Sequence, residues 1–430
     1  SLRHGRWEFL PDPWNLTKTS GAASCVPVVP PGRRNSSRFR TPVPRAPLPP
    51  GFGAIWTSVA LDLVGFGIVL PILPLYAERF GAGPAAATGL VAAFSAAQLV
   101  ASPLWGRVSD RIGRKPVLVV SLIGTCLGSL VTGLAGALWI LFLGRIIDGA
   151  SGGSVSVAQA AVADVAPPEQ RARLFGLLGA AFGLGFVAGP AIGGLAALGG
   201  PKIPFLLAAA IAGGNAVMAI RRLPETHPGA AHAEHGPVLE RIDWHRSGVT
   251  ALLAVAFTSL VAFSAFEATF SLFGERRLGL KIASTGAVFA AVGVVLSIVQ
   301  VKLVGPAVDR LGEGGTMLVG LALDAVGLVA LALVHSWLTL APALFLLVVG
   351  QGLVTPTLSS AVAGRVGAHR RGGVLGVQQA AGGLARVVGP MAGGFLFQHA
   401  GVPVPYLVGA AFMALAAVLV ASRPDLRAHP

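Results

Sequence analysis

The chain has 430 residues, of which 54 % are hydrophobic and 12 % charged, with a mean hydropathy of +0.74. Soluble domains carry about 25 % charged residues, so this composition excludes a soluble enzyme, and it is too apolar for disorder over most of its length. The formal net charge of +14 comes from scattered basic residues without a basic aromatic surface, which excludes nucleic acid as a partner. The composition predicts an integral membrane protein surrounded by the lipid bilayer.

Residues 1–50 differ in composition from the rest of the chain. They contain ten prolines, eight Lys and Arg and two acids, and they lack the apolar run of a signal peptide. This predicts a disordered N-terminal tail. Two interpretations stay open: a basic arm that touches anionic lipid or a partner, or an upstream translated stretch outside the native protein.

Twelve apolar runs follow, each close to the length of about 20 residues that a helix needs to cross the hydrocarbon core. Charged residues, Pro and Gly separate them. The expected spans are 54–76, 86–105, 116–134, 137–163, 172–198, 203–222, 249–274, 284–304, 316–335, 338–362, 373–397 and 403–422. The sequence therefore predicts an all-α membrane protein with twelve transmembrane helices.

The distribution of Lys and Arg predicts the orientation, because these residues accumulate in cytoplasmic connections. With the N-terminus inside, the inner connections and the C-terminal end hold 16 Lys and Arg, whereas the outer connections hold five. Those five are Arg79, Lys202, Arg276, Arg277 and Lys281. Both the N-terminus and the C-terminus are therefore expected to be cytoplasmic.

Two sequence patterns occur twice, at nearly the same offset. The pattern G-x3-D-R-x-G at 106–113 recurs 199 residues later, and G-P-x2-G-G at 189–194 recurs 200 residues later. Each repeat holds six expected spans, and this even number makes the repeats parallel. The expected organisation is a tail at 1–50, an N-terminal six-helix bundle at 51–222, a cytoplasmic linker at 223–247, a C-terminal six-helix bundle at 248–422 and a C-terminal tail at 423–430.

The stretch 106–115 reads GRVSDRIGRK and resembles the signature loop between helices 2 and 3 of the major facilitator superfamily. Gly106 allows close helix approach, Asp110 offers a carboxylate to a nearby helix N-terminus, and the cations can pair with it or with Asp164. The simpler interpretation is a turn that only carries positive charge. The resemblance implies the major facilitator fold of two six-helix bundles and a gating role for this loop. The gating residues are then Gly106, Asp110, Arg111, Gly113, Arg114, Lys115 and Asp164, with Gly305, Asp309 and Arg310 in the second copy.

The fifth expected span contains the pattern G-x8-G-x3-G-P-x2-G-G, which resembles a motif of drug/proton antiporters that symporters of the superfamily generally lack. Its residues are Gly176, Gly185, Gly189, Pro190, Gly193 and Gly194. Such glycines let a helix lie close to a neighbour, and Pro190 removes a backbone donor and kinks the helix. The alternative is Gly-rich packing without a specific function.

Within the superfamily, residues 54–422 resemble tetracycline/proton antiporters most. The resemblance rests on short stretches at 61–74, 144–145, 163–164, 171–176 and 320–324. One position departs from it, because tetracycline exporters carry a functional aspartate in helix 3 where Gly128 stands here. This departure argues against a tetracycline–metal chelate as the substrate, but not against export of another compound.

Charged residues within the expected spans are candidates for proton coupling and for the cavity, because a charge in the bilayer centre costs about 2.5–3.5 kcal/mol or more. They are Asp62, Arg145, Asp148, Glu267 and Asp324. The resemblance implies that helices 1, 4, 7 and 10 line the cavity, which would place the first four there. The alternatives are that Asp148 is only an ion-pair partner of Arg145, three residues away, that Glu267 is only hydrated near the outer mouth, and that Asp324 is peripheral.

The expected function is secondary active transport rather than enzymatic activity. No G-x4-G-K-[ST] phosphate loop occurs, which excludes ATP as the energy source of this chain. Neither a cofactor nor a metal is expected, since Cys25 and Cys126 match no metal-binding pattern. The chain is expected to work as a monomer in the plasma (inner) membrane and to export a small, largely apolar organic compound in exchange for protons, by alternating access. The alternatives are a proton symporter or uniporter for a nutrient such as a sugar, and a receptor or scaffold that has lost transport.

Overall fold

The computed structural model describes residues 47–167, 170–226, 248–366 and 371–423. By its contacts the chain divides into two units, Ser1–Pro47 and Leu48–Pro430, and all the helices described below belong to the second. Most of the expected N-terminal tail, linker and C-terminal tail lies outside the described residues, so those predictions stay predictions.

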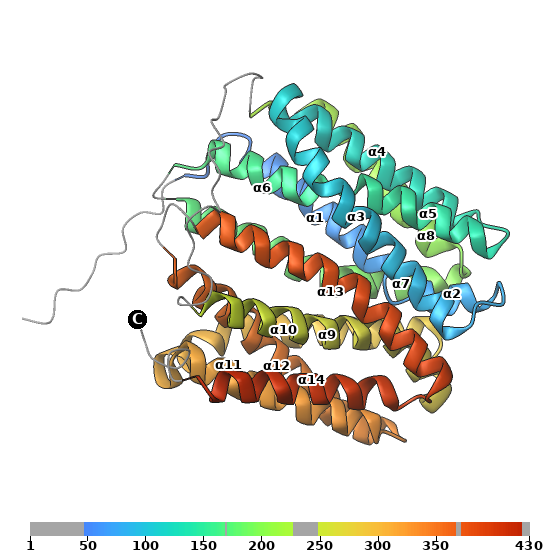
Figure 1. Ribbon diagram of the computed structural model, residues 1–430. Coiled ribbons are helices and arrows are strands. Elements are labelled where there is room, and N and C mark those ends of the chain that lie inside the picture. The colour runs from blue at the N-terminus through green and yellow to red at the C-terminus, as the bar shows by residue number, and fades with distance from the viewer. Residues whose placement is uncertain (1–46, 168–169, 227–247, 367–370, 424–430) are drawn as a thin grey trace, which may run out of the picture. The chain divides into compact units, whose positions relative to one another are not determined.

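The part of the second unit before the linker is helical and is called the N-terminal half (Figure 1). Its elements are α1 (Phe52–Val69), α2 (Leu73–Glu78), α3 (Pro84–Ile112), α4 (Arg114–Gly133), α5 (Leu138–Ser151), α6 (Ser154–Val165), α7 (Arg171–Ala196), the 3₁₀ turn η1 (Ala197–Gly199) and α8 (Ile203–Arg222).

The part after the linker is called the C-terminal half. Its elements are α9 (Val249–Leu278), α10 (Ile282–Lys302), α11 (Val304–Ala332), α12 (Trp337–Gly364), α13 (Arg371–His399) and α14 (Val404–Ala421). Across both halves, the described chain holds twelve segments that are long and apolar enough to cross a membrane, and it holds no strand. The predicted all-helical fold with twelve transmembrane segments is confirmed.

Two of the expected spans are interrupted in the structure. The expected span 54–76 divides into α1 and α2 around Pro71, which has no N–H to continue the helix. The expected span 137–163 divides into α5 and α6 at Gly152 and Gly153. There the indole of Trp105 donates a 2.7 Å hydrogen bond to the carbonyl of Ala150 and lies where a side chain on Gly153 would have to go.

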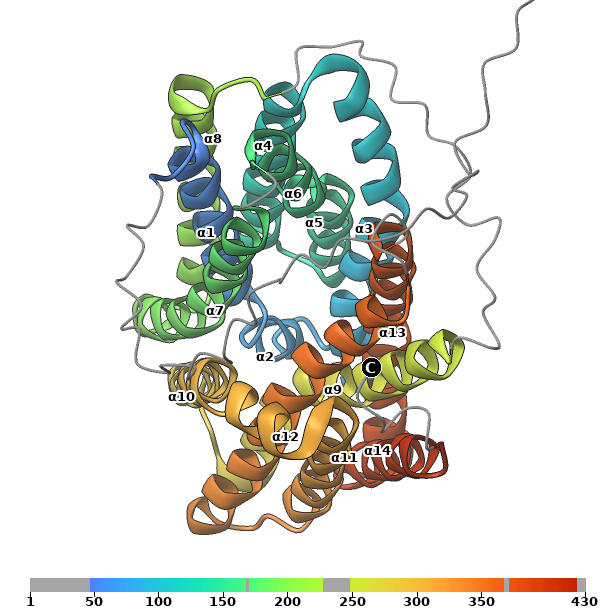
Figure 2. The same ribbon diagram turned by 90° about the vertical axis from the view of Figure 1, so that its left-hand side faces the viewer.

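The two halves contact each other mainly through two helix pairs, α3 with α13 and α7 with α10 (Figure 2), and to a smaller extent where α9 meets α2 and α3. The end of the molecule that carries residues 106–115 is called the motif end, and the opposite end is called the far end. At the far end Gln398 accepts a 3.1 Å hydrogen bond from the backbone of Ala85, and Ser271 donates one of 2.6 Å to the carbonyl of Pro71. These contacts join the halves at the far end.

Large apolar side chains also cover much of the outer surface. Val301 is 82 % exposed and Leu338 is 86 % exposed, and many other Leu, Val, Ile and Phe side chains are exposed with them. Soluble proteins rarely expose large contiguous apolar patches. The outer surface is therefore suited to contact lipid, while smaller apolar side chains and glycines let the helices approach one another inside.

Candidate functional site

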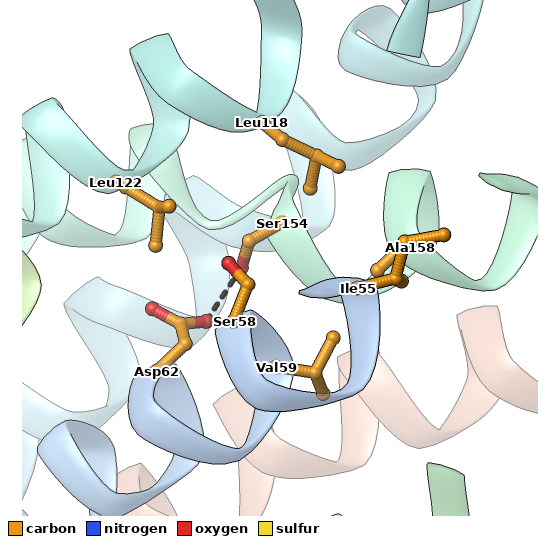
Figure 3. Close-up of a pocket in the computed structure, with 8 residues that line it drawn as sticks. All are labelled: Ile55, Ser58, Val59, Asp62, Leu118, Leu122, Ser154 and Ala158. Carbon is orange, nitrogen blue, oxygen red and sulfur yellow. Dashed lines mark hydrogen bonds between the residues drawn. The ribbon is translucent and has the colours of Figure 1, made fainter. Parts of the chain in front are cut away.

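Asp62 lies on α1 in a small pocket between α1, α4 and α6 (Figure 3). Its Oδ2 atom accepts a 2.6 Å hydrogen bond from the hydroxyl of Ser154, which is the first residue of α6. The break between α5 and α6 therefore places Ser154 beside the carboxylate. The remaining lining side chains are Ile55, Ser58, Val59, Leu118, Leu122 and Ala158. Apart from Ser58, this surrounding is apolar.

Arg145 and Asp148 form a buried ion pair on α5, with 3.0 Å between Nη1 and Oδ2. The two residues are 2 % and 7 % exposed, and their spacing of three residues places them on one helix face. A second guanidinium nitrogen donates a 3.3 Å hydrogen bond to the hydroxyl of Thr132 on α4. The pair thus faces α4 within the N-terminal half, and Asp148 is near enough to Asp62 to act on its charge.

Gly128 of α4 lies directly against Asp148. A Cβ atom on Gly128 would lie 2.8 Å from the Cβ atom of Asp148 and 2.8 Å from the carbonyl oxygen of Gly144. Since real Cβ atoms do not approach so closely, the space for an aspartate at 128 is already filled from α5. A carboxylate is therefore present next to this position, but it belongs to Asp148 and is paired with Arg145.

Glu267 and Arg386 are two charged residues within the helices of the C-terminal half. Glu267 lies on α9 and is half-buried, whereas Arg386 lies on α13, and the two charges interact. Although Arg386 is thirteen residues from the nearer end of α13, it is exposed. A charged group that is exposed at that depth indicates a space that water can reach.

Asp324 lies apart from the other candidates. It is 1 % exposed on α11, where its carboxylate meets the backbone of α12 at Gly350 and Gln351. The structure thus brings Arg145 and Asp148 together with Asp62 nearby, whereas Glu267 and Asp324 occupy separate places in the other half. Among the described residues, no group of three or more His, Cys, Asp or Glu side chains could hold a metal ion.

The loop at 106–115 is held by the side chain of Arg114. Its guanidinium contacts Asp110 at 2.5 Å, Asp164 at 3.0 Å and the hydroxyl of Ser109 at 2.6 Å. Arg114 is 8 % exposed, so the loop is fixed by one buried cation that two carboxylates share. Asp110 is thus an ion-pair partner here, whereas the nearby helix N-terminus is satisfied by a different residue.

That residue is Glu225, for which the sequence predicted neither a partner nor a role in this loop. Its carboxylate accepts hydrogen bonds of 2.8 and 3.1 Å from the backbone N–H groups of Arg114 and Lys115, the first two residues of α4. A carboxylate at a helix N-terminus satisfies free donors and complements the helix dipole. The only available signal was its place in the Leu-Pro-Glu-Thr stretch directly after α8.

The glycines of the fifth transmembrane segment lie at helix contacts. Gly185 and Gly189 of α7 face α1, where added Cβ atoms would lie 2.7 and 2.6 Å from Leu63 and Gly67. Gly194 instead faces α10 of the other half, with 3.0 Å to the carbonyl of Ala283. By contrast, a Cβ atom on Gly176 would meet nothing within 4 Å. All but the first of these glycines thus have a packing reason, and α7 links the two halves.

Comparison with known proteins agrees with this arrangement. The class E tetracycline resistance protein of Escherichia coli is 35 % identical over 349 residues, which are 79 % of this chain and 86 % of that protein. Multidrug resistance protein 2 of Bacillus subtilis is 28 % identical over 354 residues, which are 80 % of this chain and 88 % of that protein. Among solved structures, the human organic anion transporter MFSD10 (TETRAN) matches with a TM-score of 0.66 at 24 % identity, over 86 % of this chain and 98 % of that one. At this identity the structural likeness supports only the assignment of the overall fold.

The family model described as Major Facilitator Superfamily matches residues 55–303 and 301–429, which is nearly all of the chain after the tail. The twelve membrane-spanning segments and the similarity to efflux proteins agree with that match. The chain therefore belongs to the major facilitator superfamily, as a multi-pass transporter of the inner membrane and not an enzyme.

Proposed function

We propose that this transporter exports a small, largely apolar organic compound in exchange for protons. The similarity to tetracycline resistance proteins and to Bacillus multidrug resistance proteins supports drug efflux as the class of function. Proton exchange requires a group that binds a proton in one state of the cycle and releases it in another. The proposal therefore depends on which carboxylate within the helices can do this.

The observation that carries the proposal is the environment of Asp62. Its carboxylate accepts a hydrogen bond from Ser154 in a pocket that is apolar apart from the two serines, Ser58 and Ser154, and no described cation forms an ion pair with it. The hydroxyl of Ser154 can donate to the ionised carboxylate or accept from the protonated acid, because a hydroxyl does both. Asp62 can therefore gain and lose a proton without leaving a buried partner charge uncompensated.

Asp148 is the second candidate, and its ion pair assigns it a different role. Protonation of Asp148 would leave the buried Arg145 without a counter-charge, which is costly in a low-dielectric interior. We therefore propose that the pair stays ionised through the cycle while Asp62 carries the proton.

Alternating access is supported by where the halves touch. Hydrogen bonds join them at the far end, and glycines of α7 and α13 lie against α10 and α3 of the opposite half. Rocking of the halves about the α7–α10 and α3–α13 pairs would open the far end and close the motif end. The network around Arg114 would then hold the motif end of the N-terminal half rigid during this motion.

The test uses everted membrane vesicles that carry the full chain, an imposed acid interior and a pH-sensitive dye. Cationic and neutral drugs, tetracycline included, are added to wild type, to Asp62→Asn and to the control Glu313→Gln. We expect at least one compound to release protons from the vesicles with wild type and with Glu313→Gln, and Asp62→Asn to reduce this release to the level of empty vesicles.

Two results would contradict the proposal. Protons moving in the same direction as the compound would indicate a symporter, and proton release that Asp62→Asn leaves unchanged would place the coupling group elsewhere. Binding of the active compound to purified Asp62→Asn, measured as the rise in the unfolding temperature of the protein, distinguishes a lost proton site from a misfolded protein.

A further inference from the structure

An apolar groove runs along the outer side of the C-terminal half between α10 and α12. Its lining is contributed by these two helices alone, and almost all of its surface is apolar. The lining residues are Val288, Ala291, Val292 and Val295 of α10 and Trp337, Leu340, Ala341, Leu344, Phe345 and Val348 of α12. None of the charged candidates described above lines it.

The groove has a floor and a rim on α12. Leu340, Leu344 and Val348, four residues apart, are 2 %, 8 % and 2 % exposed and form the floor. Trp337 and Phe345, on the neighbouring stripe of the helix, are 53 % and 57 % exposed and form the rim. The floor separates the groove from the interior, and the rim leaves it open to the surrounding lipid.

The groove is closed beyond Val348. One turn beyond Val348, a Cβ atom on Gly352 would lie 2.6 Å from Val299 of α10, so the two helices touch there. From Trp337 to Val348 the lining spans eleven helical steps, or about 16 Å. The hydrocarbon core is about 30 Å thick, so the groove is as deep as one leaflet.

Positive charge surrounds its far-end mouth. Lys281 directly precedes α10, and His335 lies two residues before α12, where its Nε2 atom accepts a 2.5 Å hydrogen bond from Arg277. The N-termini of α10 and α12 add the positive ends of their helix dipoles. No Asp or Glu occurs between Glu275 and Asp309, or between Asp324 and Asp425.

We infer that this groove binds one acyl chain of an anionic phospholipid from the far-end leaflet, with the phosphate between Lys281 and Arg277. The length of one leaflet, the apolar floor and the cationic mouth each fit this ligand. Trp337 at the rim suits the interfacial level, where aromatic rings concentrate. A drug passing from the bilayer to the interior would need an open floor, and this floor is closed.

The test uses the purified full chain in nanodiscs of phosphatidylcholine that contain a phosphatidylglycerol probe with a photoactivatable acyl chain. A phosphatidylcholine probe with the same chain is the matched lipid, and cross-linked peptides are mapped by mass spectrometry. We expect the anionic probe to label 288–295 and 337–348 at least about fivefold more than the neutral one, the ratio that either of the two basic groups would supply by itself. Unlabelled phosphatidylglycerol should displace it better than unlabelled phosphatidylcholine.

Variants test the apolar groove and the basic residues at its mouth separately. Ala341→Trp fills the groove and should abolish the labelling, whereas Ala411→Trp on the exposed face of α14 should leave it unchanged. Replacing Lys281 and Arg277 together by Gln should make the two probes equal. Three results would each overturn the inference: even labelling of all lipid-facing helices, equal labelling of wild type by both probes, and displacement of the probe by an apolar drug. All three are measured on wild type, so none depends on whether a variant folds.

Discussion

The two copies of the signature loop share a backbone but differ in what holds it. Gly113 and Gly312, at equivalent places, have φ of 100° and 72° with ψ of 162° and 171°. In the first copy the next residue, Arg114, joins Asp110 and Asp164. In the second copy the next residue is Glu313, which accepts a hydrogen bond from Ser360, while Asp309 and Arg310 are exposed.

The two copies show that the turn and the ion network of this motif depend on different residues. The repeated letters G-x3-D-R-x-G determine the turn, because only glycine readily adopts these dihedral angles. The ion network and the cap on α4 depend on residues that are not repeated, namely Arg114, Asp164 and Glu225. The N-terminal copy is therefore expected to hold its end of the molecule more strongly than the C-terminal copy.

The largest effect is expected where the turn and the network coincide. Gly113→Ala strains the backbone and places a Cβ atom 2.5 Å from Oε2 of Glu225, so we expect a loss of unfolding free energy of about 3 kcal/mol. Gly312→Ala carries the strain alone and should lose about 2 kcal/mol. Thermal unfolding of the purified variants measures both. Gly176→Ala, with open space around the new methyl group, is the control and should lose nothing.

The second effect isolates the network. Arg114→Ala leaves two carboxylates without their shared cation, at a cost of about 2 kcal/mol. The cost is below that of a fully buried pair because the Asp110 and Asp164 side chains are 42 % and 24 % exposed. Arg310→Ala in the second copy should change the unfolding free energy by less than about 0.5 kcal/mol. Equal losses at the two arginines would refute the distinction between the copies.

Sequence reasoning was successful where the determining residues are close together in the chain. Hydropathy gave the twelve spans, and the spacing of Arg145 and Asp148 gave a pair on one helix face. It missed contacts between distant segments. Ser154 is 92 residues from Asp62, and Trp105 is 45 residues from the carbonyl that it holds at the α5–α6 break. Hydropathy cannot detect such contacts because they arise only when the helices pack.

Gly128 illustrates the same point at the candidate site. The sequence shows a missing aspartate, but only the structure shows that Asp148 of the next helix fills the adjacent space. In the same way, Glu225 lies 111 residues from the helix N-terminus that it caps. Residue type alone placed it in a connection, and its partner could not be identified without the fold.

The third effect tests the cap by itself. Glu225→Gln keeps an oxygen that can accept from the N-terminus of α4 but removes the negative charge, so we expect a loss of about 1 kcal/mol. The loss should shrink as salt is added, since the interaction of the charge with the helix dipole is screened. Thermal unfolding at low and high salt measures this. A loss that salt does not change would mean that the carboxylate acts only as a hydrogen-bond acceptor.

The last effect is a dependence of stability on pH and is expected at the far end, where a charged cluster joins the halves instead of bracing one of them. Glu78 of α2 lies 3.6 Å from Arg276 of α9 and is also close to Glu275, and burial together with the second carboxyl raises the pKa of Glu78 from 4.5 to about 7.

Because the pKa of Glu78 is higher in the folded protein, protonated Glu78 adds stability below about pH 4.5, and this contribution is lost as the pH rises through about 7. The unfolding free energy of wild type should therefore fall as the pH rises between these values. In Glu78→Gln, which imitates the protonated form, the plot of unfolding free energy against pH should lose this slope. The Arg114→Ala variant is the matched comparison, since its network lies within one half and it should retain the slope. An unchanged slope in Glu78→Gln would show that the contact between the halves does not sense pH through this carboxyl group.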